Sequence, residues 1–267
     1  MQKRILITGA TDGIGYETAK ALVELGHHVI VHGRSQSKLD TVTNQLSVFG
    51  KVEPVLADLS NLDAVANMAY EVQQRFGTLD VLINNAGVFS TPSPVTLEGL
   101  DVRFVVNTIA PYQLTKTLLP LIEKDGRVVN LSSAAQAPVS IPALMGETQL
   151  GDGEAYAQSK LALTMWSRWL GEMNKTQGPM IVSVNPKSLL GSKMVKDAYG
   201  IAGGDIKLGA EILIRAALSE EFSQAHGLYF DNDIERFSQP HSDALDDAKV
   251  EAVIEALETF NTEMKKG

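Results

Sequence analysis

A loop containing three glycines follows directly on the first apolar segment of the chain. The segment spans residues 4–8, and Gly9, Gly13 and Gly15 come before an amphipathic helical pattern. Glycine lets backbone N–H groups approach a phosphate closely, and the start of a helix adds partial positive charge. The sequence therefore predicts that this loop holds the pyrophosphate of a dinucleotide. Its spacing is Gly-x-x-x-Gly-x-Gly, which differs from the longer-known Gly-x-Gly-x-x-Gly fingerprint.

Short, β-rich apolar segments alternate with helical patterns along the chain. This alternation is typical of a parallel sheet with helices on both faces. The predicted fold class is therefore α/β, a doubly wound sheet of the Rossmann type with about seven parallel strands. The predicted strands are residues 4–8, 28–32, 51–57, 79–84, 126–132, 180–185 and 227–231. The predicted helices are residues 13–25, 36–47, 61–76, 98–123, 153–175 and 205–219.

Residues 1–267 are predicted to form a single domain, since one α/β domain of this length can bury a large core. Two segments with several glycines, 134–152 and 187–204, fit neither a strand nor a long helix. Both follow strands, so we expect them at the carboxyl edge of the sheet as active-site loops. An apolar stripe at helical spacing, from Val250 to Phe260, predicts a C-terminal helix over 243–262.

Charge and composition argue against several classes of function. A net charge of −9 disfavours nucleic acid and anionic membranes as partners. The chain has no cysteine, which excludes disulfides and thiolate chemistry, and its five histidines form no metal-ligand pattern. No apolar run approaches the ~20 residues that span a bilayer, and the first strand follows Met1 too closely for a targeting segment. We therefore expect a cytoplasmic protein without a metal, acting on a small molecule.

The end of the second predicted strand favours NADP over NAD. A carboxylate there would accept a hydrogen bond from the ribose 2′-hydroxyl of NAD, whereas an arginine accommodates the 2′-phosphate of NADP. The sequence reads His32-Gly33-Arg34-Ser35 and has no acid at this point. Arg34 is therefore the candidate phosphate-binding residue, with Ser35 and Lys38 assisting. The alternative is that Arg34 is a solvated residue at the end of a strand.

Polar side chains also end the third and fourth predicted strands. Asp58 could accept a hydrogen bond from an adenine amino group, or it could cap the next helix through Ser60 or Asn61. The consecutive amides Asn84 and Asn85 precede a glycine, which suits a tight turn against the adenosine half of a dinucleotide. Amides at a buried strand end are costly unless they are hydrogen-bonded, so both should have partners.

Tyr156 and Lys160 lie one helical turn apart, so their side chains share a helix face. A phenol has a pKa near 10, and a neighbouring ammonium lowers it toward neutrality while desolvation opposes the change. The pair is thus suited to proton transfer. Ser133, after the fifth predicted strand, can bind a substrate oxygen as charge develops on it, and Ser132 is the alternative. Asn107 lies in an apolar helical segment and needs partners there.

Four segments, in order along residues 4–231, resemble the signatures of the short-chain dehydrogenase/reductase family. They are Thr8–Gly15, Asn84–Gly87, Val129–Ser133 and the Tyr156-x-x-x-Lys160 motif. The resemblance is to NADP-type members and is somewhat retinol-dehydrogenase-like. It implies an NADP(H)-dependent oxidoreductase that interconverts a carbonyl and an alcohol. It implies four catalytic residues, Asn107, Ser133, Tyr156 and Lys160. Among these, Tyr156 would be the acid/base, Lys160 would also bind the nicotinamide ribose, and Asn107 would hold a water in a relay to the lysine. The residues expected to contact the cofactor are Gly9, Thr11, Asp12, Gly13, Ile14, Gly15, Arg34, Ser35, Asp58, Leu59, Asn85, Ala86, Gly87, Tyr156, Lys160, Pro186 and Ser188.

The sequence departs from the family pattern at two places. The interval between Ser133 and Tyr156 is longer than usual, and the extra residues could form a flap over the site or pack on the neighbouring helix. Lys187 follows Pro186 where the family usually has glycine. If that position has positive φ, lysine costs about 1 kcal/mol or more; alternatively, Lys187 reaches the cofactor phosphates or the substrate.

Three questions stay open at this level. Apolar residues in the 187–204 segment suggest an apolar substrate, or they simply pack the loop: Leu189, Leu190, Met194, Val195 and Tyr199. The chain could be a nucleotide-sensing protein without turnover, or an enzyme of the same fold that epimerises or dehydrates. A homodimer or homotetramer would pair the helices at 98–123 and 153–175, unless the long 134–152 segment blocks that pairing.

Overall fold

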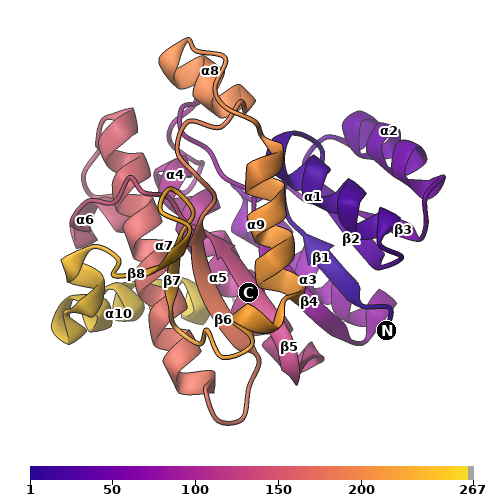
Figure 1. Cartoon of the computed structure of the whole chain (residues 1–267). Helices are drawn as coiled ribbons and strands as arrows, with labels where there is room; N and C mark the ends of the chain where they lie inside the picture. The colour runs from indigo at the N-terminus through magenta and orange to yellow at the C-terminus, as the bar shows by residue number, and fades with distance from the viewer. Residues whose placement is uncertain (264–267) are drawn as a thin grey trace.

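The computed structural model describes residues 1–263, so the predictions for residues 264–267 lie outside the described part of the chain. One mostly parallel sheet runs through it, with helices on both faces (Figure 1). The strands are β1 Arg4–Ile7, β2 His28–Gly33, β3 Val52–Leu56, β4 Leu79–Asn84, β5 Ile122–Leu131, β6 Met180–Asn185, β7 Tyr229–Asp231 and β8 Arg236–Ser238. The helices are α1 Gly13–Glu24, α2 Gln36–Ser47, α3 Leu62–Phe76, α4 Val102–Phe104, α5 Ala110–Leu118, α6 Ile141–Leu144, α7 Asp152–Asn174, α8 Lys193–Tyr199, α9 Lys207–Leu218 and α10 Asp247–Glu263.

The strand order is β3-β2-β1-β4-β5-β6-β7-β8, and all neighbours are parallel except β7 and β8. This confirms the α/β, doubly wound fold. It also corrects the strand count, because the antiparallel strand β8 pairs Phe237 with Phe230 of β7 and extends the sheet by one strand. The order in which strands are added to the sheet reverses between β1 and β4. In this architecture ligands bind at the carboxyl edge of the sheet at such a point.

The predicted helix 98–123 is wrong at both ends and in its middle. It starts at Val102, continues as a π-helical turn over Val105–Ile109, and becomes α5 at Ala110. Residues 119–121 form a 3-10 turn, and β5 already begins at Ile122. A π turn carries one residue more than an α turn, and such turns recur at functional sites.

Two apolar cores, one on each face of the sheet, hold the helices in place. On one face Leu6, Ile30 and Leu82 pack with α3, α5, α7 and α10. On the other face Ile7, Val31 and Ile83 pack with α1, α2 and α9. Alternate residues of the central strands thus serve opposite faces, which fixes the strands as the middle layer of three.

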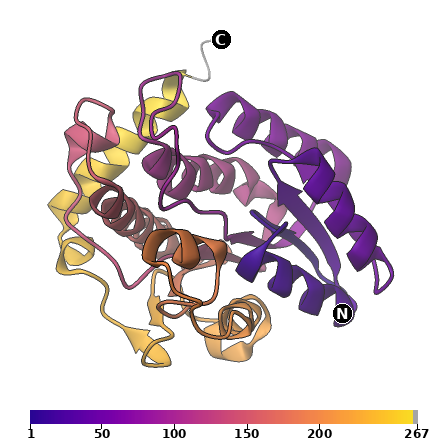
Figure 2. The ribbon, with the colours of Figure 1, turned by 90° about the horizontal axis from the view of Figure 1, so that it is seen from above.

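The 134–152 segment packs against neighbouring helices instead of forming a flap. Its short helix α6 is capped by Ser140, whose hydroxyl accepts a hydrogen bond from Ala143 N, and Leu144 is fully buried in the core. Gly146 has a φ of +81°, and a Cβ on it would lie 2.8 Å from the Gly99 carbonyl oxygen. Residues 187–204 instead lie at the carboxyl edge of the sheet, and their helix α8 is at the top of Figure 1 and faces the viewer in Figure 2.

The predicted C-terminal helix is present as α10, which begins at Asp247 after a 3-10 turn over Ser242–Leu245. It packs against α7 and α6 and contributes Val253 and Leu257 to the core. Its Glu258 accepts hydrogen bonds from the Tyr112 hydroxyl and the Lys116 amine of α5. None of the described helices is long and apolar enough to cross a membrane.

Candidate functional site

The glycine loop is a tight turn between β1 and α1. Gly9 has a φ of +66°, and a Cβ on it would lie 2.8 Å from the Ala86 Cα. A Cβ on Gly15 would lie 2.3 Å from the Gly9 carbonyl oxygen and 2.4 Å from Asn85 Nδ2. Asp12 caps α1 by accepting a hydrogen bond from Gly13 N at 2.8 Å. The loop is therefore packed against residues 84–87, the turn that follows β4 and is called the β4 turn below, and its backbone leads into the amino end of α1.

His32 supports this loop from β2. Gly9 N donates to its Nδ1 at 3.1 Å, and its Nε2 lies 3.1 Å from the Ala57 carbonyl oxygen at the end of β3. Burial lowers the pKa of His32 to about 4, so the ring stays neutral and accepts at Nδ1. This histidine therefore joins the ends of three neighbouring strands.

Arg34 is exposed at the carboxyl end of β2. Among residues 1–263 its guanidinium has no ion-pair partner, since none of the ion pairs of this part of the chain includes it. Ser35 occupies the cap position of α2, with its hydroxyl 3.2 Å from that of Ser37. A groove of about 550 Å³ runs beside it between the glycine loop and α2, and Thr11 and Lys38 line it.

Asp58 forms a turn with the residue two positions later. Its Oδ1 accepts from Ser60 N at 3.0 Å and from Ser60 Oγ at 2.8 Å, while Asn61 caps α3. Asp58 thus does not cap α3 itself, as its local role would require, and its exposed side chain is still open to an adenine amino group. The Leu59 side chain is buried in the core, which leaves only its backbone for a ligand.

Asn84 and Asn85 both have partners, as predicted. Asn85 Nδ2 donates to the carbonyl oxygens of Thr8 at 2.9 Å and Gly9 at 3.0 Å, which ties the β4 turn to the glycine loop. Asn84 Nδ2 donates to Thr115 Oγ1 and Asn130 Oδ1, whereas Asn84 Oδ1 is buried without a partner in the described chain. Asn85 thus shapes the cofactor side of the turn, and Asn84 belongs to the interior.

Lys160 is buried under the carboxyl edge, with 2% of its surface exposed. Its Nζ donates to the Leu131 carbonyl oxygen at 2.6 Å and lies 5.8 Å from the centre of the Tyr156 ring. Burial lowers the pKa of Lys160 to about 8, and at pH 7 the amine is still mostly protonated. Tyr156 is half-buried and packs against Phe89, with ring centres 5.0 Å apart. Sequence reasoning missed Phe89, for which the turn at 84–87 gave no signal.

Asn107 lies in the π-helical turn and is fully buried. Its Oδ1 accepts from Val88 N at 2.8 Å, and its Nδ2 donates to the Val88 carbonyl oxygen and to Ser159 Oγ, both at 2.9 Å. Ser159 Oγ in turn donates to the Tyr156 carbonyl oxygen at 2.7 Å. Ser159 thus connects Asn107 to the helix turn of Tyr156. Ser159 lies within the Tyr156-x-x-x-Lys160 motif, but nothing in the sequence links it to Asn107, which is 52 positions away.

Gly87 lies where these groups meet. A Cβ on it would lie 3.3 Å from Asn107 Oδ1, 3.5 Å from Lys160 Nζ and 3.9 Å from the Met194 Cε atom of α8. The structure therefore brings Gly87, Asn107 and Lys160 together. It also places Met194 beside them, whereas Leu190 is buried and packs near Gly209. The side chain of Tyr199 lies outside those that the structure describes.

The two serines after β5 have different surroundings. Ser132 is buried, and its hydroxyl lies 2.7 Å from that of Thr164 on α7. Ser133 is half-buried, and its Oγ accepts from Ala135 N at 3.1 Å. Its carbonyl oxygen accepts from the Tyr229 hydroxyl at 3.2 Å. Of the two, Ser133 has the hydroxyl that is open to a ligand, which favours it over Ser132.

Lys187 has a φ of +116°, so the glycine position of the family is occupied by a lysine in the conformation that glycine favours. Such a backbone costs an ordinary residue about 1–3 kcal/mol. The preceding Pro186 is buried, and the following Ser188 is exposed. Leu189, next along, also has positive φ at +53°.

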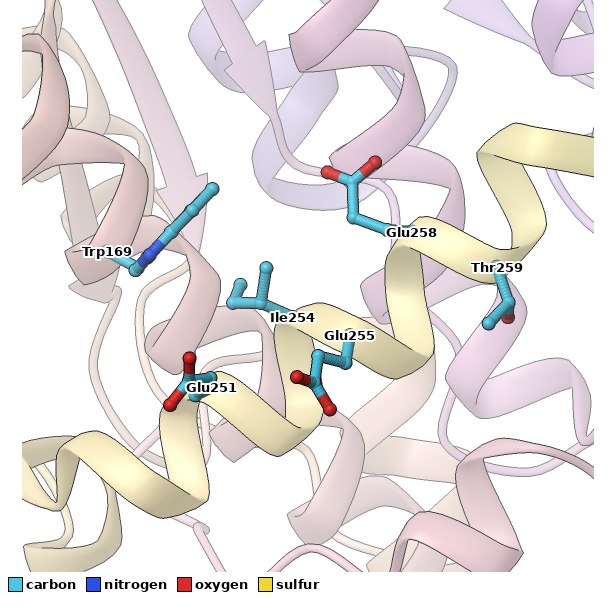
Figure 3. A pocket seen from close by; sticks show the side chains of 6 residues that line it. All are labelled: Trp169, Glu251, Ile254, Glu255, Glu258 and Thr259. Atoms are coloured by element: carbon cyan, nitrogen blue, oxygen red, sulfur yellow. The ribbon is translucent and has the colours of Figure 1, made fainter.

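A second depression, of about 410 Å³, lies between α7 and α10, away from the glycine loop (Figure 3). Trp169 faces Ile254 across it, and the carboxylates of Glu251, Glu255 and Glu258 surround it. None of the predicted site residues lines it. The groups that could bind a dinucleotide therefore gather only at the carboxyl edge of the sheet within the described chain.

Comparisons with known proteins agree with this geometry. A family model for short chain dehydrogenases matches residues 3–199. The chain is 34% identical to human polyprenol dehydrogenase over 189 residues, which are 67% of this chain and 57% of that protein. It is 31% identical to bovine retinol dehydrogenase 12 over 244 residues, 85% of this chain and 77% of that protein.

One solved structure is a short chain dehydrogenase from Burkholderia cenocepacia in complex with NADP. It superposes with a TM-score of 0.69 at 25% identity, covering 86% of this chain and 95% of that chain. The protein described here belongs to the short-chain dehydrogenase/reductase family. Members of this family are oxidoreductases that bind nicotinamide cofactors, and interconversion of carbonyls and alcohols is their general chemistry.

Proposed function

We propose that the chain is an NADP(H)-dependent oxidoreductase that interconverts a carbonyl and an alcohol, with Tyr156 as the acid/base. The observation that carries the proposal is the meeting of Gly87, Asn107 and the buried Lys160 amine beside the helix turn of Tyr156. A side chain at Gly87 would fill the space that these groups share. The residues present therefore fit a nicotinamide cofactor, which supplies or takes up hydride when bound.

The remaining roles follow from the surroundings of each group. Lys160 holds its positive charge below the Tyr156 ring, which favours the phenolate when the proton leaves. Ser133 offers a hydroxyl to the oxygen on which charge develops. Asn107 uses its side chain to fix Val88 and Ser159, so it positions the β4 turn relative to α7.

The preference for NADP rests on Arg34. Its guanidinium is exposed and unpaired within residues 1–263, at the strand end where an acid would select NAD. Lys38 adds a second positive charge at the neighbouring groove. The NADP complex of the Burkholderia relative is consistent with this preference.

The substrate that we propose is an apolar carbonyl or alcohol. Met194 reaches the side of the site next to Gly87, and Phe89 covers the ring of Tyr156. Both surfaces are apolar, and an apolar substrate would bury them. The relatives that are named for polyprenol and retinol support the same class.

The test begins with titration of the protein with NADPH and NADH, followed by nicotinamide fluorescence. Arg34→Ala is expected to weaken NADPH binding roughly 10- to 100-fold, because hydrogen bonds to charged groups contribute about 1.5–3 kcal/mol, and to leave NADH binding unchanged. Lys124→Ala, an exposed lysine at the start of β5, is the control. Equal weakening of both cofactors would remove Arg34 from phosphate binding.

Turnover is tested with Tyr156→Phe and a panel of apolar aldehydes and ketones. The variant is expected to retain NADPH affinity and to lose more than about 100-fold in kcat, because removal of a general acid typically costs roughly 10²–10⁴-fold. Undiminished turnover would refute the role of Tyr156. Tight NADPH binding without turnover by the unmodified chain would instead favour a nucleotide-sensing protein.

A further inference from the structure

Backbone strain is concentrated at one corner of the molecule. Only three residues other than glycine have positive φ in the described chain, and they are Lys187, Leu189 and Glu235. The first two follow β6, and the third lies in the turn between β7 and β8. Hydrogen bonds join these two segments directly, so the unusual conformations belong to one local structure.

The β7–β8 turn holds the backbone on both sides of Lys187. Asn232 Nδ2 donates to the Pro186 carbonyl oxygen at 2.9 Å. Asp233 accepts from Ser188 N at 2.9 Å through Oδ1 and from the Ser188 hydroxyl at 2.5 Å through Oδ2. Lys187 therefore lies between two residues that are each fixed by the turn. A strained conformation persists when its surroundings determine it in this way.

The turn is itself anchored to the sheet. Asn185, which is 1% exposed at the end of β6, donates through Nδ2 to Asp231 Oδ1 at 2.8 Å and to Asp233 Oδ2 at 2.9 Å. Burial alone would raise the pKa of Asp233. The hydrogen bonds from Ser188 and Asn185, together with the Lys187 charge, hold this pKa below its usual range, so the carboxylate stays ionised at neutral pH.

The segment that starts here leads over the candidate active site. The Leu189 carbonyl oxygen accepts from Gly204 N at 2.8 Å, which closes residues 189–204 into a loop. That loop carries α8, whose Met194 reaches Gly87 beside the Lys160 amine. The direction in which the chain leaves β6 thus decides where Met194 lies.

We propose that Asp233 is a positioning residue, which holds the strained backbone at Lys187 so that the 187–204 segment lies over the active site. The kinetic part of this proposal rests on the proposed function, and the structural part does not. Neither a ligand nor a catalytic step is assigned to Asp233. It acts through Ser188 and the neighbouring backbone.

The experiment is a double-mutant cycle of Asp233→Ala and Lys187→Gly. Without the carboxylate, Lys187 is expected to leave its positive φ and release the segment. Glycine tolerates this φ, so loss of the Asp233 carboxylate should release the segment less in the Lys187→Gly background. Two measurements apply to all variants. One is the rate of trypsin cleavage after Lys193, Lys196 and Lys207, mapped by mass spectrometry, and the other is kcat and KM for carbonyl reduction with NADPH.

We expect Asp233→Ala to raise the cleavage rate at least tenfold and to raise KM about tenfold with a smaller change in kcat. In the Lys187→Gly background both changes should shrink at least threefold. Asp125→Ala, an exposed acid at the start of β5, removes the same charge away from this corner and should match the unmodified protein. If Asp233→Ala fails to fold, Asp233→Asn retains the shape of the side chain and is expected to show the same pattern with smaller changes.

Two outcomes would overturn the proposal. Cleavage of Asp233→Ala at the rate of the unmodified protein would show that the carboxylate does not hold the segment. Equal effects of Asp233→Ala with and without the Lys187→Gly substitution would show that Asp233 acts independently of the strained backbone. If no carbonyl is reduced by any variant, the proposed function fails, but the cleavage pattern still decides the role of Asp233.

Discussion

Replacing Lys160 by methionine is expected to make the stability of the protein less dependent on pH. The amine is buried and donates to one acceptor that the structure identifies, the Leu131 carbonyl oxygen. Burial lowers the pKa of Lys160 from 10.5 to about 8. One pKa unit corresponds to about 1.4 kcal/mol, so the ionised amine costs the folded state about 3 kcal/mol at pH 7.

The sign of this contribution follows from the protonation states. Above pH 10.5 the amine is neutral in both folded and unfolded chains, and there is no cost. Between pH 10.5 and 8 the unfolded chain takes up the proton first, so the free energy of unfolding falls as pH falls. Below about pH 8 both forms are charged, and the full cost is present. Lys160→Met removes this titration.

The measurement is urea denaturation at pH 7 and pH 10 of variants in a Tyr156→Phe background, which prevents titration of the neighbouring phenol. The free energy of unfolding of Lys160→Met minus that of its parent should be about 2–3 kcal/mol larger at pH 7 than at pH 10. At either pH alone the gain is offset, since the substitution leaves the Leu131 carbonyl without its donor at a cost of about 1–3 kcal/mol. Lys124→Met, at an exposed site, should show no such difference. A relative stability of Lys160→Met that is the same at both pH values would refute the burial argument.

Three further predictions concern other parts of the molecule. Ser133→Ala should lower kcat roughly 100-fold without loss of stability. Ser132→Ala should keep its kcat and lose about 1 kcal/mol of stability, measured by urea denaturation. The reverse pattern would exchange the roles of the two serines. Because α10 packs on α7 and its Glu258 binds two side chains of α5, light scattering should find the protein monomeric. Glu258→Gln should shift it toward a dimer, and a dimeric unmodified protein would contradict this prediction. The free energy of unfolding should fall by about 3 kcal/mol as pH falls from 6.5 to 4, because His32 is protonated there only in the unfolded chain. A His32→Asn variant with the same pH dependence would contradict this assignment.

The alternation of apolar and helical segments was sufficient to predict the parallel sheet, because buried parallel strands need continuous apolar runs. The same signal is too weak for β8, which has three residues and pairs only with β7 in the described chain. The π-helical turn around Asn107 was also missed. A π turn differs from an α turn in which carbonyl oxygen accepts from each N–H, and the side-chain pattern of five residues does not indicate that difference.

The residues of the candidate site were easier to predict from the sequence than the contacts that hold them in place. Glycine spacing and the Tyr-x-x-x-Lys pattern identify groups by their chemistry, so Gly9, Tyr156 and Lys160 could be singled out before their positions were known. The sequence also showed that Lys187 replaces a glycine, and the structure adds the positive φ. Asp233 holds this backbone through Ser188, which is 45 positions away along the chain, so the contact could be found only in three dimensions.

One face of α7 is hydrogen-bonded to the sheet and sets the register of the helix that carries Tyr156. Polar residues recur along this helix at Lys160, Thr164 and Ser167, all of them buried. Each is hydrogen-bonded to the end of β5 or the residues that follow it, namely Leu131, Ser132 and Asn130. Apolar packing has no direction and tolerates small slips of a helix, whereas a row of hydrogen bonds fixes its register. Of this row, only Lys160 was singled out from the sequence. In the fold the row is turned toward the sheet, and it thereby holds Tyr156 at the carboxyl edge.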